Sequence, residues 1–177
     1  MRHIIRGGRY FRIGARAWQN LRDTSYAKAL GGRWNVAGSF GALYLNATIE
    51  VAAANARRLH EGELYSLDDL RPEMQPDLVP FDVERRPFVD AVGRNGLRAL
   101  RLPPRTPYGV PHGPCQEAAA RAYAAGELGI AAHSAADANA TSFVGEELAV
   151  FDRAVGAAKA RRRIRFDRWY YRSPSRG

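Results

Sequence analysis

The sequence predicts an α+β fold, because short β-prone segments outnumber helical ones and are separated by glycine- and proline-rich turns. Helical periodicity is confined to two stretches, 49–60 and 116–128. With 177 residues and no internal repeat, the chain is expected to form one domain, 1–177, with a core at about 5–170 and a frayed tail at 171–177. Strands are predicted over 4–14, 42–45, 129–134, 147–151 and 164–170.

The first half of the chain gives the clearest elements. Apolar and arginine residues alternate irregularly with β-prone ones over 4–14, which indicates a strand, whereas 17–30 is left open between a helix and a covering loop. The helix over 49–60 begins after two alternative caps, Asn46 and Thr48, and carries Glu50 in its first turn.

The second half contains more breaks. Four prolines between residues 61 and 90 exclude a long helix there and predict two or three short strands or turns. A proline-rich loop is expected over 103–114, and an irregular stretch over 135–142. Near-alternation predicts a last strand over 164–170, with its apolar side chains packed inward and its arginines solvated.

The net charge of +9 is divided unevenly along the chain. Residues 1–60 carry +8, residues 61–152 carry −7 and residues 153–177 carry +8. Such asymmetry is typical of a polyanionic partner, which could be nucleic acid, a phosphorylated ligand or an acidic protein surface. One cysteine, no long apolar run and no signal-peptide pattern predict a cytoplasmic protein without a membrane span.

Candidate chemistry is concentrated in residues 31–50. The glycines would let the backbone approach a ligand, and the Arg33 guanidinium could bind a pair of phosphate oxygens. Tyr44 offers a ring for stacking, and a carboxylate at Glu50 could stabilise a developing cation. The glycine spacing matches neither a dinucleotide fingerprint nor a phosphate loop.

Other chemistry finds little support in the sequence. The four histidines and Cys115 show no zinc spacing, so no metal site is predicted. Cys115 is expected to be a small buried hydrophobe rather than a nucleophile paired with His112 or His133.

Gly32-Arg33-Trp34-Asn35, the tyrosine of Leu43-Tyr44-Leu45 and the following Glu50 resemble the RES domain family, the toxins of bacterial Xre–RES toxin–antitoxin pairs. The family's arginine, glutamate and serine would fall on Arg33, Glu50 and Ser134. The later blocks 129–135 and 146–151 follow in order, although His133 stands where the family often has proline.

This resemblance implies an ADP-ribosyltransferase-like split β-sheet with flanking helices and NAD+ as the substrate, with no prosthetic group. In that reading Arg33 binds the diphosphate, Tyr44 walls the nicotinamide, and Glu50 holds the ribose hydroxyl and stabilises the cation. Substrate-binding roles are implied for Arg12, Gly32, Asn35 and Ser134, with Asn35 equally suited to holding the turn.

The predicted function is thus cleavage of the nicotinamide N-glycosidic bond of NAD+, by hydrolysis or phosphorolysis, in a toxin neutralised by an Xre-type helix-turn-helix antitoxin. Two alternatives stay open: an ADP-ribosyltransferase acting on a protein, and a basic nucleic-acid-binding protein without NAD chemistry. Direct nucleic-acid binding is not expected, because no nucleic-acid motif matches and the middle of the chain is acidic.

Overall fold

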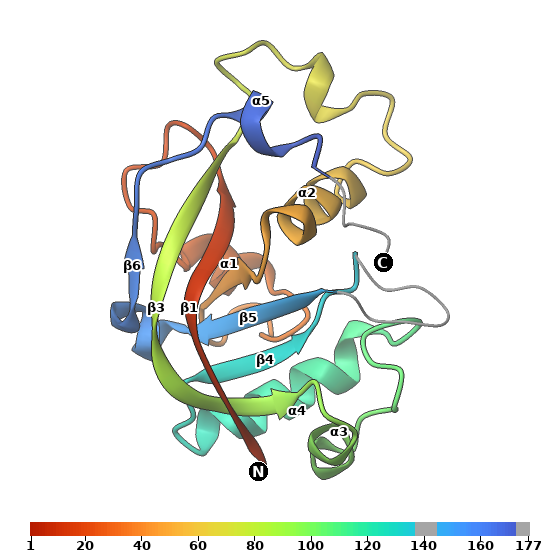
Figure 1. Cartoon of the computed structure of the whole chain (residues 1–177). Coiled ribbons are helices and arrows are strands. Elements are labelled where there is room, and N and C mark those ends of the chain that lie inside the picture. Colours follow the sequence, from red (N-terminus) through yellow and green to blue (C-terminus); the bar gives the residue numbers. More distant parts are fainter. Residues whose placement is uncertain (137–144, 173–177) are drawn as a thin grey trace.

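A computed structural model of the chain describes residues 1–136 and 145–172, and these confirm the α+β class (Figure 1). The strands are β1 (His3–Gly14), β2 (Ala42–Asn46), β3 (Asp77–Ala91), β4 (Gly129–His133), β5 (Glu146–Phe151) and β6 (Ala158–Ala160). The helices are α1 (Ser25–Leu30), α2 (Ile49–Arg58), α3 (Arg94–Leu100), α4 (His112–Ala124) and α5 (Phe166–Trp169), with 3-10 turns at Leu67–Asp69 and Asp152–Ala157.

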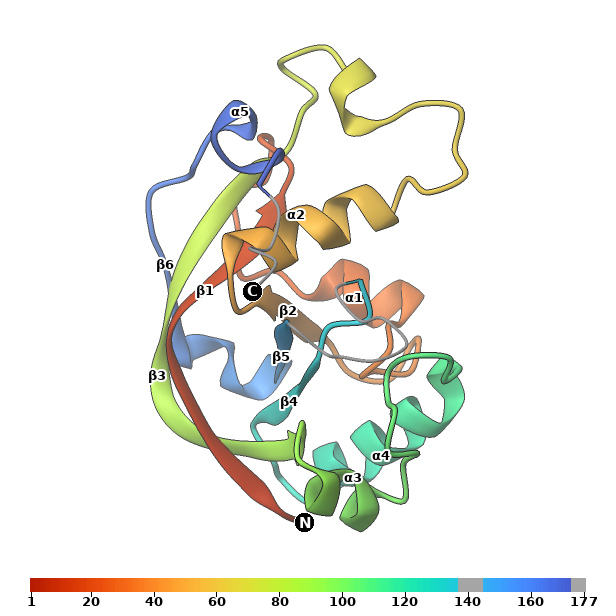
Figure 2. The ribbon, with the colours of Figure 1, turned by 45° about the vertical axis from the view of Figure 1, so that its right-hand side comes forward.

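The strands form a connected sheet in the order β1-β2-β5-β4-β3-β6, and β1 also pairs with β3. Every pairing is antiparallel except that of β3 with β4. The long β1–β3 pair crosses the shorter strands β4 and β5, and α1 to α4 lie together on one side of it (Figure 2).

The region 61–90 corrects a sequence prediction, because residues 77–91 form the single 15-residue strand β3 rather than two or three short pieces. Pro80 lies within it, opposite Phe11 of β1. The Pro80 carbonyl points away from β1 and accepts the Arg161 N–H at 2.8 Å. A residue's N–H and C=O lie on the same side of a strand, so the N–H that proline lacks does not interrupt pairing with β1.

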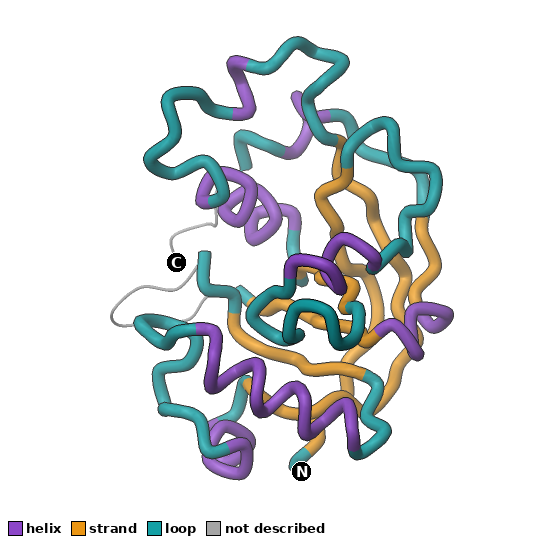
Figure 3. Tube along the Cα trace, turned by 180° about the vertical axis from the view of Figure 1, so that it is seen from behind, coloured by secondary structure: helices purple, strands orange, loops and turns teal. Residues whose placement is uncertain are grey.

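The side chains of β2, β4 and β5 divide between the two faces of the sheet. Leu43 and Leu45 point to one face, with Leu148 and Val150 of β5. The opposite face is apolar at one end and is covered by α4, whose buried residues are Cys115, Ala118, Ala119 and Ala122 (Figure 3). Because side chains alternate along strands, Tyr44, Asn46 and Glu147 share that covered face, at its polar end. This end holds the candidate site.

Helix α2 follows the sequence prediction and selects one of the two possible caps. Thr48 is the N-cap, and its hydroxyl accepts the Val51 N–H at 3.2 Å. Asn46 belongs instead to β2. The small-residue face of α2 packs against Phe166 and Trp169 of the C-terminal segment.

The predicted strand over 164–170 is wrong: Ile164 makes one bridge to Leu78, and Phe166–Trp169 then forms the short helix α5. Phe166 and Trp169 are nevertheless buried, so the inward packing is confirmed. Phe166 and Trp169 contact α2 at helical spacing, and the alternating sequence pattern did not reveal this tertiary contact.

The remaining segments differ modestly from expectation. In the segment 17–30, for which a helix and a covering loop were both considered, residues 25–30 form α1. Helix α3 was not predicted. Helix α4 begins at His112, inside the expected loop 103–114, because proline is tolerated in the first turn of a helix. The expected irregular stretch 135–142 and frayed tail 171–177 fall largely outside the described residues.

Candidate active site

The turn that carries Arg33 is held by Tyr44 of β2. The Tyr44 hydroxyl accepts the Trp34 N–H at 2.8 Å and donates to Asn35 Oδ1 at 2.9 Å. The Asn35 amide donates to the carbonyls of Ala27 at 2.7 Å and Phe40 at 3.2 Å, and Asn35 is fully buried. Of the two roles left open for Asn35, this geometry supports holding the turn.

Gly32 of this turn lies directly against Tyr44. A Cβ at Gly32 would lie 2.6 Å from the Tyr44 hydroxyl and 3.0 Å from Asn35 Oδ1. The Gly32 carbonyl accepts a hydrogen bond from Gln116 of α4 at 2.9 Å. Gly32 therefore lets the turn lie against β2 while α4 holds it from the other side.

The Arg33 side chain extends from this turn and lines a cavity of about 610 Å³. Its guanidinium donates to the Val110 carbonyl at 2.8 Å. Within the described residues, no carboxylate forms an ion pair with Arg33 or with Arg58, which comes from the end of α2. The cavity is lined by Arg33, Arg58, Glu61, Pro107, Tyr108, Gly109, Val110, Pro111, Ala135 and Ala136.

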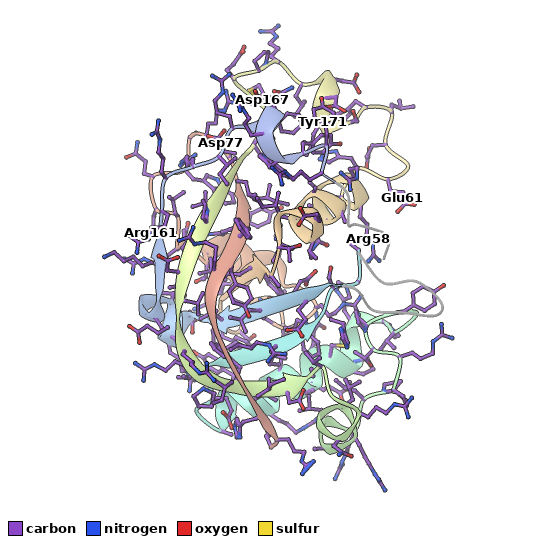
Figure 4. The ribbon with its side chains drawn as sticks, viewed as in Figure 1. Arg58, Glu61, Asp77, Arg161, Asp167 and Tyr171 are labelled. Carbon is purple, nitrogen blue, oxygen red and sulfur yellow. The ribbon has the colours of Figure 1, made fainter. Side chains whose placement is uncertain are left out.

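Figure 4 shows Arg58 and Glu61 at the C-terminal end of α2, facing the side where the cavity lies. His112 begins α4 directly after the lining residue Pro111. Desolvation, followed by the positive charges of Arg33 and Arg58, lowers the pKa of His112 below its ordinary value. The two arginines therefore place positive charge beside His112 at the edge of the cavity, where they suit an anionic ligand, while Glu61 contributes one carboxylate to the same lining.

The buried Cys115 side chain lies beneath Arg33, with the two joined by a 4.0 Å contact from the guanidinium to Sγ. Burial raises the pKa of the Cys115 thiol, and the nearby Arg33 offsets only part of that effect. A buried thiol with a raised pKa is a poor nucleophile, so the structure favours the packing role expected for Cys115.

A polar cluster lies at the end of the covered sheet face. Ser134 donates from Oγ to Glu147 Oε1 at 2.7 Å, and Asn55 of α2 donates from Nδ2 to the same oxygen at 2.8 Å. Asn55 Nδ2 also lies 2.6 Å from Asn46 Oδ1. Ser134 is fully buried, and the chain after it leads to Ala135 and Ala136 in the cavity wall.

Glu147 also affects the tyrosine of the site. Burial raises the pKa of Tyr44 well above its ordinary value, and the negative charge of Glu147 adds to the rise while Arg33 opposes it. The cavity arginine, the tyrosine and the carboxylate of the cluster thus lie within electrostatic reach of one another.

Glu50 does not join this group. Its carboxylate lies 4.0 Å from the Arg172 guanidinium, and within residues 1–136 and 145–172 no hydrogen bond connects it to Arg33, Tyr44 or Ser134. The structure thus brings Arg33, Tyr44, Gly32, Asn35 and Ser134 to one end of the sheet and places Glu50 on another side of α2.

Arg12, the second predicted phosphate ligand, is engaged elsewhere. Its guanidinium donates to the carbonyls of Leu21 at 2.6 Å and Asp23 at 2.9 Å, and it lies 4.7 Å from the centre of the Trp18 ring. Burial lowers the pKa of Arg12. These contacts hold the loop after β1, and they place Arg12 outside the candidate site.

Sequence reasoning missed Asn55, Arg58, His112 and Glu147 as site residues. For Asn55, the available signal was helical phase, because an asparagine interrupts the alanine-rich face of α2. For Glu147, it was one of two carboxylates at the start of a strand whose other residues are apolar.

Two further observations bear on chemistry and placement. In the part of the chain that the structure describes, no three histidine, cysteine or acidic side chains gather as a metal-binding group. Among the same residues, no helix has both the length and the apolar character needed to cross a membrane.

Together the fold and the site define an α+β protein with two arginines in the wall of a cavity and a hydrogen-bonded cluster of Ser134, Asn55 and Glu147 near it. The model of the RES domain family matches residues 9–172, and the chain therefore belongs to the RES domain family.

A solved structure shares this fold. It is the crystal structure of the M. tuberculosis MbcT–MbcA toxin–antitoxin complex, which has a TM-score of 0.73 over 96% of this chain and 92% of that chain, with 16% sequence identity. No curated protein sequence matches the chain.

Proposed function

We propose that this chain is the toxin of a toxin–antitoxin pair and that it cleaves the bond between nicotinamide and ribose in NAD+. The observation that carries the proposal is the cavity lined by Arg33 and Arg58, whose wall also includes Ala135, the residue after Ser134 of the Ser134–Glu147 pair. Membership of the RES domain family and the likeness to a toxin–antitoxin structure support it.

The cavity matches the charge and size of a dinucleotide. Its volume of about 610 Å³ lies within the range of roughly 300–1,000 Å³ typical of small-molecule sites. Arginine binds phosphate oxygens through paired N–H donors, and Arg33 and Arg58 have no carboxylate partner among the described residues. In this proposal they hold the diphosphate, and the partly exposed Tyr44 ring lies against the nicotinamide.

The reaction needs little proton chemistry at the leaving group. The ribose C1′–N bond breaks, both electrons go to the nicotinamide nitrogen, and nicotinamide departs neutral. The ribose gains oxocarbenium character, which a nearby carboxylate stabilises. Water or phosphate then bonds to C1′ and loses a proton to solvent. A protein nucleophile as acceptor would make the same chemistry an ADP-ribosyltransfer.

The proposal extends to fold and partner. The crossing of the β1–β3 pair over β4 and β5 supports an ADP-ribosyltransferase-like split sheet (Figure 1). NAD+ cleavage in the cytoplasm would poison the producing cell, so the toxin needs a neutralising protein, which we expect to be an Xre-type helix-turn-helix antitoxin.

The nucleic-acid alternative finds less support in the structure. Arg161 of the basic C-terminal segment bonds Asp82 at 2.5 Å, and Arg163 lies 3.7 Å from Asp77. Figure 4 labels Arg161, which lies on the β6 side of the molecule, and Asp77, which lies at the start of β3. These two arginines make ion pairs within the fold, whereas the sequence predicted that the arginines of this segment would be solvated.

The test is incubation of purified protein with NAD+, with and without phosphate, while nicotinamide release is followed. Release without phosphate indicates hydrolysis, release only with phosphate indicates phosphorolysis, and radiolabel on a protein indicates ADP-ribosyltransfer. An Arg33→Ala protein with an unchanged melting temperature is the control for a contaminating enzyme. No release under any condition, together with steeply salt-dependent nucleic-acid binding, would contradict the proposal.

A further inference from the structure

We propose that Glu147, rather than Glu50, is the carboxylate that stabilises the ribosyl cation, and that Ser134 and Asn55 are its positioning residues. This inference rests on the function proposed above and assigns the residue that supplies its negative charge. It follows from the strand register, the helical phase of α2 and the hydrogen bonds at one oxygen.

The strand register places Glu147 on the face of the sheet that leads to the cavity. Tyr44 lies opposite Ala149, and Asn46 lies opposite Glu147. Residues two apart on a strand share a face, so Glu147 and Tyr44 are diagonal neighbours on the same side of the sheet. The Glu147 side chain is half-buried, and its charge contributes to the raised pKa of Tyr44.

The helical phase of α2 separates Glu50 from this face. Five residues along an α-helix correspond to a rotation of about 140°, so Glu50 and Asn55 project in very different directions. Asn55 reaches Asn46 and Glu147, whereas Glu50 approaches Arg172 of the C-terminal segment. The Glu50 side chain therefore points away from the cluster that Asn55 joins.

Among the described residues, the hydrogen bonds to Glu147 fall on one of its two carboxylate oxygens. Ser134 and Asn55 both donate to Oε1, at 2.7 and 2.8 Å. Within the described residues, Oε2 makes no hydrogen bond. Two neutral donors fix the orientation of the carboxylate. Among the described residues no cation forms an ion pair with it, so its negative charge is not compensated by a neighbouring side chain.

This arrangement provides what the reaction needs from the enzyme. As the C1′–N bond breaks and its electron pair leaves with nicotinamide, positive charge develops on the ribose. Oε2 of Glu147 would accept a hydrogen bond from a ribose hydroxyl and stabilise that charge, while Oε1 stays bonded to Ser134 and Asn55. The acceptor then donates its lone pair to C1′, and Glu147 forms no covalent bond.

The experiment compares Glu147→Gln with Glu50→Gln in the nicotinamide-release assay, with melting temperatures measured for both. Glutamine can retain both hydrogen bonds at Oε1 while removing the charge. We expect kcat to fall about 10²- to 10³-fold in Glu147→Gln with little change in KM. Glu50→Gln, the same chemical change on the other side of α2, should stay within about threefold of wild type, the scale of a weak surface ion pair.

The outcomes separate the two proposals. A wild-type protein that releases no nicotinamide contradicts the proposed function itself. An active wild type whose activity survives Glu147→Gln, or is abolished by Glu50→Gln, overturns the assignment of Glu147 alone. If Glu147→Gln does not fold, Glu147→Asp retains the charge but withdraws it, and a folded Glu147→Asp protein with wild-type kcat would also overturn the assignment.

A double-mutant cycle tests the positioning role. Ser134→Ala should lower kcat in the wild type about tenfold, because one of the two donors at Oε1 is lost. The same change in the Glu147→Gln background should lower kcat much less. A merely structural serine would have equal effects in both backgrounds, and that result would reject Ser134 as a positioning residue.

Discussion

Gly32 lies so close to Tyr44 that a Cβ on the glycine would be 2.6 Å from the tyrosine hydroxyl. That distance is shorter than any normal contact of a Cβ, and the hydroxyl cannot withdraw without losing its bonds to Trp34 and Asn35. The absence of a side chain at Gly32 is therefore a requirement of the turn that presents Arg33.

We expect Gly32→Ala to destabilise the protein by about 1–3 kcal/mol, the usual effect of overpacking, and to reduce nicotinamide release in the folded fraction. Urea denaturation and the release assay measure the two effects. Gly156→Ala is the matched control, since nothing lies within 4 Å of its Cβ position, and it should stay within about 0.5 kcal/mol of wild type. Equal stabilities of the two variants would contradict the steric argument.

Tyr44→Phe should destabilise the protein by about 1–3 kcal/mol, because the buried Trp34 N–H and Asn35 Oδ1 each lose a partner. Urea denaturation at pH 8 measures this difference. Phenylalanine keeps the ring that we expect to face nicotinamide, so KM for NAD+ should change little even though the free energy of unfolding falls. A variant as stable as wild type would show that the hydroxyl does not hold the turn.

The same pair of proteins has a predictable pH dependence. Burial first, and then the charge of Glu147, raises the pKa of Tyr44 in the folded state above the unfolded value of about 10. The stabilisation from the neutral hydroxyl is therefore complete below about pH 10 and is lost as pH rises toward the folded pKa. The stability difference between wild type and Tyr44→Phe should shrink above pH 10, and a difference that grows there would contradict this sign.

Local sequence patterns predicted the part of the site that depends on neighbours in the chain. Arg33, Asn35 and Tyr44 lie within twelve residues, and a glycine-rich turn followed by a short apolar strand suffices to bring them together. The cap and the small-residue face of α2 were equally local. These contacts require no knowledge of how distant strands pair.

The carboxylate could not be identified in this way. Glu50 is nearer to Tyr44 in sequence, but Glu147 reaches the site through the pairing of β2 with β5, about one hundred residues later in the chain. Long-range register also decided β3 and α5: β1 supports a strand that contains prolines, and contact with α2 favours a helix at Phe166–Trp169. Tertiary contacts overrode local propensity in both places.

Arg58→Gln should raise KM for NAD+ about threefold to tenfold with a smaller effect on kcat, because the proposal gives Arg58 a role in diphosphate binding and not in bond cleavage. The effect should weaken at high salt, since Arg58 is exposed. Arg162→Gln removes the same charge from an exposed position outside the cavity lining and should leave KM unchanged. Equal changes in KM for both variants would indicate only a general charge effect.

His112 offers a direct measure of anion binding in the cavity. Desolvation and the charges of Arg33 and Arg58 lower its pKa in the free protein, so it is neutral at pH 7. Inorganic phosphate bound between the two arginines would offset their field, and the pKa of His112 should rise in an NMR titration.

The linked consequence is that phosphate should bind more tightly as the pH falls through the pKa of His112. Arg58→Gln should raise the pKa of His112 without phosphate, because it removes one of the two positive charges that lower it. The further rise on adding phosphate should then be smaller than in wild type. A pKa of His112 that stays constant up to saturating phosphate would show that the anion binds elsewhere, and the diphosphate would have to be placed away from Arg33 and Arg58.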